Sequence, residues 1–121
     1  MDPHLYHAHL DTLRQVPRSP VQQDDEFAAF TAYDYGRRRR LHPDVAWEDA
    51  CRAYAFAAAS HAGHAGTLDL DTELQLEDHW DRLRGDGGPE WPVARTLLRE
   101  TWRWLDEHGH DHDRIAQAVR H

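Results

Sequence analysis

The stretch of residues 47–62, WEDACRAYAFAAASHA, decides the fold of the chain. Apolar side chains recur in it at helical spacing and form a single stripe: Trp47, Ala50, Cys51, Tyr54, Ala58 and His61. The alanines between them have high helix propensity and small side chains, so other helices can approach closely. We therefore predict a central helix that is capped by Asp44 and ended by Gly63 and Gly66.

Two further helices are predicted on the N-terminal side of this stretch. Asp2 and Pro3 are typical of a helix start, and the apolar spacing that follows predicts a helix over residues 3–15. Residues 17–23 contain two prolines and show no periodicity, as in a connection. A second helix then begins after Asp24 and Asp25, and its aromatic residues are spread broadly around it: Phe27, Phe30, Tyr33 and Tyr35.

The segment from Leu68 to Leu76 alternates apolar and polar residues, a pattern that by itself favours a strand. The acidic residues between the leucines disfavour a strand, however, and no second alternating run could pair with it. We therefore predict a helix over residues 71–84. Periodicity after Pro92 predicts a further helix that stops at Gly109, followed by a short last helix over residues 113–120.

The composition is that of one globular domain. The 121 residues are 40% hydrophobic and include five Trp, four Tyr and three Phe, which supply large apolar area in few side chains. We predict an all-α single domain over residues 1–121, a bundle of four main helices plus a short C-terminal helix. Its expected core contains Trp47, Tyr54, Trp80, Leu97, Leu98 and Trp102, with Cys51 as a small buried hydrophobe.

Charge and hydropathy exclude several classes of function. No apolar run is long enough to span a bilayer and no signal segment is visible, so we expect a cytoplasmic protein without membrane contact. The net charge of -8 argues against a general nucleic-acid binder. All fourteen basic residues are Arg, a bias typical of GC-rich bacterial genomes.

Arg37, Arg38, Arg39 and Arg40 form a basic run at the end of the second helix. Four guanidinium groups could hold a phosphate or an acidic partner, which makes the run a candidate anion-binding site. The alternative is a solvated helix end, because the helix dipole favours cations near a C-terminus.

Eight of the eleven histidines fall into three groups. The first group is His4, His7 and His9, of which His4 and His7 could share a face of the first helix with Asp11. His108, His110 and His112 alternate with other residues near the C-terminus. Together they form a candidate site for a divalent transition metal such as Zn, Ni or Cu, which requires the two terminal helices to meet. The alternative is a set of solvated histidines. His61 and His64 are explained as cations at a helix C-terminus.

The stretch from Phe27 to Phe56 contains the segment Ala-Tyr-Asp-Tyr-Gly (32–36), then a polar gap and Trp47 followed by Glu48. It resembles small uncharacterised bacterial helical proteins that carry an aromatic Tyr-Gly segment before a Trp-containing helix. The arginine run departs from their usual pattern. The resemblance covers about a quarter of the chain; it implies helical hairpins and no particular activity.

The sequence shows no complete catalytic signature. The best acidic cluster, Glu73, Glu77, Asp78 and His79, has no nucleophile beside it and is typical of a solvated helix face. We expect a non-catalytic interaction or stress-associated protein without a cofactor, whose surplus aromatic residues form a surface for a protein partner or a homodimer. The alternative is the metal-binding bundle described above.

Overall fold

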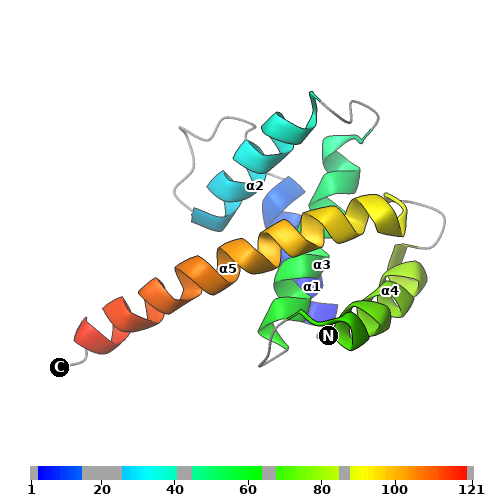
Figure 1. Cartoon of the computed structure of the whole chain (residues 1–121). Helices are drawn as coiled ribbons and strands as arrows, with labels where there is room; N and C mark the ends of the chain where they lie inside the picture. The colour runs from blue at the N-terminus through cyan, green and yellow to red at the C-terminus, as the bar shows by residue number, and fades with distance from the viewer. Residues whose placement is uncertain (1–2, 15–25, 41–44, 64–67, 85–87, 120–121) are drawn as a thin grey trace.

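The computed structural model describes residues 3–14, 26–40, 45–63, 68–84 and 88–119, with the side chains of 108–119 outside the description. These residues form a bundle of helices without strands (Figure 1). The elements are α1 (Pro3–Arg14), α2 (Glu26–Arg38), α3 (Trp47–Ala62), α4 (Leu70–Arg84) and α5 (Trp91–Val119). The prediction of an all-α single domain is confirmed.

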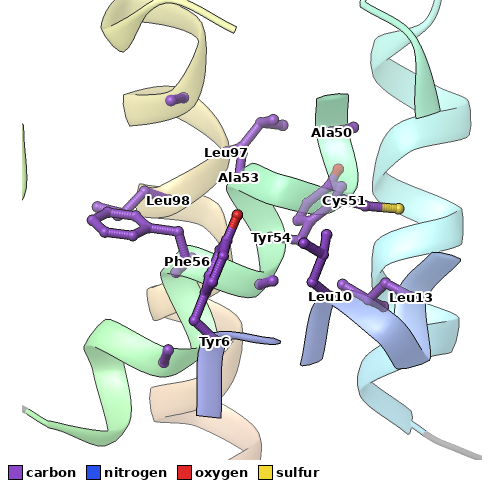
Figure 2. Packing of buried hydrophobic residues seen from close by; sticks show 14 of the residues in the cluster. Tyr6, Leu10, Leu13, Ala50, Cys51, Ala53, Tyr54, Phe56, Leu97 and Leu98 are labelled. Atoms are coloured by element: carbon purple, nitrogen blue, oxygen red, sulfur yellow. The ribbon is translucent and has the colours of Figure 1, made fainter. Parts of the chain in front are cut away.

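Helix α3 lies at the centre of the bundle, as predicted (Figure 1). Every residue from Ala53 to Ser60 is buried, which is possible because most of them are alanines and leave room for helices on several sides. Figure 2 shows Leu10 and Leu13 of α1 beside α3, with Leu97 and Leu98 on α5. The six residues predicted as the core are all buried: Trp47, Tyr54, Trp80, Leu97, Leu98 and Trp102. Cys51 is also buried.

The ends of the helices differ in detail from the sequence expectations. The N-cap of α3 is Ala46, which makes no side-chain capping bond, so the assignment of this role to Asp44 is wrong; Asp44 itself lies outside the described residues. Helix α4 is capped by Asp69, whose Oδ1 accepts a hydrogen bond of 2.8 Å from the backbone N–H of Thr72. The helix predicted over residues 71–84 is confirmed and begins at Leu70, one residue earlier, so Leu70, Leu74 and Leu76 are helical and Leu68 precedes the helix.

Helix α5 is longer than expected, because it runs from Trp91 to Val119 without a break. The predicted stop at Gly109 and the separate helix over residues 113–120 are therefore wrong. A glycine inside a helix costs only about 1 kcal/mol relative to alanine, and no proline follows to block the next turn. The C-terminal half of α5 extends away from the other helices (Figure 1).

None of the described helices is both long enough and apolar enough to cross a membrane.

Candidate binding sites on helix α2

The arginine run at the end of α2 is organised by a buried carboxylate that sequence analysis missed. Asp34 is 1% exposed. Its Oδ2 accepts hydrogen bonds from the hydroxyl of Tyr54 at 2.6 Å and from Nε of Arg38 at 2.8 Å. Its Oδ1 accepts a third, from Nη2 of Arg37 at 3.0 Å. Two of the four arginines therefore neutralise a carboxylate of their own helix.

Tyr54 stays protonated within this network. Burial raises the pKa of its phenol well above the usual range, and the neighbouring Asp34 carboxylate raises it further. The hydroxyl therefore stays a hydrogen-bond donor at any physiological pH. Since Tyr54 lies on α3, its bond to Asp34 also ties α2 to the centre of the bundle.

A cavity of about 190 Å³ lies between the C-terminal end of α2 and the first turns of α5. Its lining is mostly apolar, with two arginine side chains among the apolar ones: Tyr35, Arg38, Arg39, Val45, Pro92, Val93, Thr96 and Leu97. The side chain of Arg38 is only 18% exposed. Two residues of the predicted anion-binding run, Arg38 and Arg39, line this cavity. Arg40 is exposed and does not line it.

An open groove of about 620 Å³ follows the outer face of α2. Phe30 and Trp104 line it, and their rings are stacked with centroids 4.9 Å apart. The ring of Phe27 lies 6.0 Å from that of Trp104. Tyr33, which also lines the groove, is 63% exposed. Phe27, Phe30 and Trp104 are half-buried, and Phe27 and Phe30 also pack against the core, so Tyr33 is the exposed aromatic side chain of this group.

Glu73 on α4 is the second buried carboxylate, and it corrects the expectation of a solvated acidic face. It is 5% exposed and accepts hydrogen bonds from Arg95 and Arg99 of α5, the shortest being 2.6 Å from Nε of Arg99 to Oε1. The bond from Arg99 lowers the pKa of Glu73, and that from Arg95 adds to the effect. The arrangement joins two helices. His79 and Asp78 of the same cluster are exposed, and Asp78 pairs with Arg82 at 2.7 Å.

The candidate metal ligands of α1 are exposed to solvent. His7 lies edge-on to Tyr6, and the Asp11 carboxylate is 3.9 Å from Arg14. His4 is on the same helix, while the side chains of His108, His110 and His112 are outside the described part of the chain. Among the side chains that are described, no group of three or more His, Cys, Asp or Glu is placed to hold a metal ion. The metal site stays a prediction.

The other histidines of the sequence analysis lie near the end of α3. His61 is in its last turn, as expected, and its Nε2 is 2.7 Å from Oδ1 of Asp106 on α5. Its ring also lies edge-on to Trp102, with centroids 5.2 Å apart. His61 therefore links α3 to α5. His64 lies outside the described residues.

No protein-family model, curated protein or solved structure matches the chain.

Proposed function

We propose that the chain is a non-catalytic cytoplasmic interaction protein and that its partner on the outer face of α2 is a second copy of itself. The observation that carries this proposal is the groove beside α2, where exposed Tyr33 adjoins the stacked rings of Phe30 and Trp104. Exposed aromatic surface of this kind is enriched at protein interfaces.

The groove-lining residues of α2 form one stripe, which we call the α2 stripe. Glu26, Ala29, Phe30, Tyr33 and Arg37 recur at intervals of three and four residues and therefore lie on one face of the helix. The stripe lies across the helix from the buried residues Ala28, Thr31 and Tyr35, and its half-buried member Phe30 also packs edge-on against Tyr54. Its exposed members, Glu26, Tyr33 and Arg37, are spread along about 16 Å of helix.

The two ends of the α2 stripe carry opposite charges. When two copies of α2 pack antiparallel about a two-fold axis, Glu26 of one copy lies opposite Arg37 of the other, and the reverse pair forms at the far end. In the same register Phe30 faces Tyr33 of the second copy, and the small side chain of Ala29 allows close approach. Arg37 donates one bond to Asp34 and is 56% exposed, so further donors of its guanidinium can reach a second carboxylate.

Charge reversal tests this geometry. Glu26→Arg alone and Arg37→Glu alone place like charges opposite each other twice, so each variant should dimerise at least about tenfold more weakly than the unmodified chain. An equimolar mixture of the two variants restores both opposite-charge pairs and should form a heterodimer. Sedimentation equilibrium at about 0.15 M salt measures all three, because this ionic strength screens the general repulsion between two chains of net charge -8.

The control uses a matched pair of charges on another helix. Asp78→Arg and Arg82→Glu reverse an exposed pair on α4 and should leave self-association unchanged. Circular dichroism checks that Arg37→Glu still folds, since Asp34 keeps Tyr54 and Arg38 as partners. A strictly monomeric chain at about 1 mM, or dimerisation indifferent to both reversals, contradicts the proposal.

A further inference from the structure

We infer that the cavity between α2 and α5 is a binding site for a small carboxylate with an apolar body about the size of a benzene ring. The site is separate from the α2 stripe: it uses Arg38 and Arg39, which point around α2 away from the stripe by the helical repeat. It therefore does not depend on self-association.

The size and walls of the cavity define the apolar part of the ligand. Its volume is about 190 Å³, and an apolar cavity of about 150 Å³ in another protein is large enough to bind benzene. Val45, Val93 and Leu97 contribute aliphatic walls. The ring of Tyr35 adds an aromatic wall. Its hydroxyl already donates a hydrogen bond of 2.8 Å to the carbonyl of Val45, so it is not offered to a ligand as a donor.

Arg38 defines the charged part. Its Nε is bound to Asp34, and the terminal nitrogens of the same guanidinium remain as donors on a side chain that lines the cavity. The Asp34 network fixes this guanidinium in place before any ligand arrives, which reduces the entropy lost on binding. Two adjacent terminal N–H groups match the two oxygens of a carboxylate.

Two further features add positive potential around the cavity. Arg39 is exposed and lines it, so a second guanidinium can approach the ligand from the solvent side. Pro92 and Val93 belong to the first turn of α5, where the helix dipole is positive. The segment from Asp34 to Arg40 contains four arginines and one carboxylate. Its net charge is therefore positive, although the whole chain is acidic.

The lining favours a monocarboxylate over a phosphate group or a nucleic acid. Thr96 already donates its hydroxyl proton to the carbonyl of Pro92. The two arginines are therefore the charged donors among the described lining residues, and most of the remaining wall is apolar. A doubly charged, strongly hydrated phosphate would lose water against that wall without gaining partners. A carboxylate needs fewer donors, and its apolar body gains from burial.

Benzoate is the probe for the test, with benzyl alcohol as its neutral analogue and inorganic phosphate as an anion without an apolar body. We expect benzoate to bind with a dissociation constant of about 0.1 to 1 mM, as measured by two-dimensional NMR titration of the full chain. Benzyl alcohol and phosphate should each bind at least about tenfold more weakly, a difference of about 1.4 kcal/mol.

Three variants locate the binding. Arg39→Gln should weaken benzoate binding about tenfold, whereas Arg40→Gln, a matched change one residue away, should leave it unchanged because Arg40 does not line the cavity. Val93→Trp fills the cavity from a half-buried position and should abolish binding. Glu26→Arg, which disrupts the α2 stripe, should bind benzoate normally, so the two proposals can fail separately.

The outcomes that overturn the inference are equally specific. Absence of benzoate binding up to about 50 mM, a concentration far above the expected constant, contradicts it. Equal affinities for benzoate and benzyl alcohol would show that the site does not recognise the carboxylate. Tighter binding of phosphate than of benzoate would show that Arg38 and Arg39 form a general anion site. Benzoate binding that persists in folded Val93→Trp places the ligand elsewhere.

Discussion

The hydroxyl oxygen of Tyr54 on α3 lies 2.6 Å from Oδ2 of Asp34 on α2, in the buried interior of the bundle. This bond joins two helices whose sequences are twenty residues apart at these positions. It also holds the carboxylate that positions Arg37 and Arg38. The same contact therefore stabilises the fold and orients the arginines of both proposed binding surfaces.

Replacing Tyr54 by Phe should lower the free energy of unfolding by about 1–3 kcal/mol, because a buried carboxylate loses a donor that nothing replaces. Tyr33→Phe is the matched control: it removes the same atom from a side chain that is 63% exposed, and it should change stability by less than about 0.5 kcal/mol. Urea denaturation measures both. Equal stabilities of the two variants would show that the Tyr54 bond contributes nothing net.

Glu73 should make the stability depend on pH. Its pKa in the folded chain is lowered from the ordinary value of 4.5 by Arg99 and Arg95, so its contribution is present above pH 4.5 and is lost as the pH falls through the folded value. Glu73→Gln should therefore be less stable than the unmodified chain by about 1–3 kcal/mol near pH 7 and approach it in stability near pH 3. Urea titrations at the two pH values measure this; a difference that does not shrink in acid contradicts the expectation.

Two buried tryptophans should respond differently to replacement by Phe. Nε1 of Trp80 donates to the carbonyl of Pro89 at 2.9 Å, whereas Nε1 of Trp47 has no hydrogen-bond partner among the described residues. Both changes remove the same volume from the core, so Trp80→Phe should cost about 1 kcal/mol more than Trp47→Phe. Thermal or urea unfolding of the pair tests this, and an equal or larger loss at Trp47 contradicts the expectation.

Asp69→Ala should remove the cap of α4 and destabilise the chain by about 1 kcal/mol, because the N–H of Thr72 loses its acceptor. Asp81→Ala changes an exposed aspartate in the last turn of the same helix, away from the cap, and serves as the control. Differential scanning calorimetry compares the melting temperatures. Indistinguishable values would mean that water replaces the cap without loss.

Helical periodicity was sufficient to predict the helices and the core. Trp47 and Tyr54 are buried because they lie on the stripe that the spacing identifies, and α4 is a helix because an isolated alternating segment has no strand to pair with. The stop predicted at Gly109 is wrong for a local reason, because the cost of one glycine is small compared with that of breaking a long helix.

The candidate sites were less predictable, because their partners are distant in sequence. Asp34 and Arg38 could have been recognised from their spacing of four residues, but the donor that completes the network, Tyr54, comes from another helix. Glu73 resembles the solvated acids around it, and its partners Arg95 and Arg99 follow 22 and 26 residues later. The groove beside α2 likewise depends on how α2 and α5 pack, which composition does not specify.

The alanines of α3 also limit how this protein can diverge. Ala55 and Ala57 are fully buried and belong to the hydrophobic core of the bundle. A larger side chain at either position would force the surrounding core residues apart at a cost of about 1–3 kcal/mol. Substitutions on the outer faces of the helices can therefore change what related proteins bind. Larger side chains at the buried alanines of α3 would instead destabilise the fold.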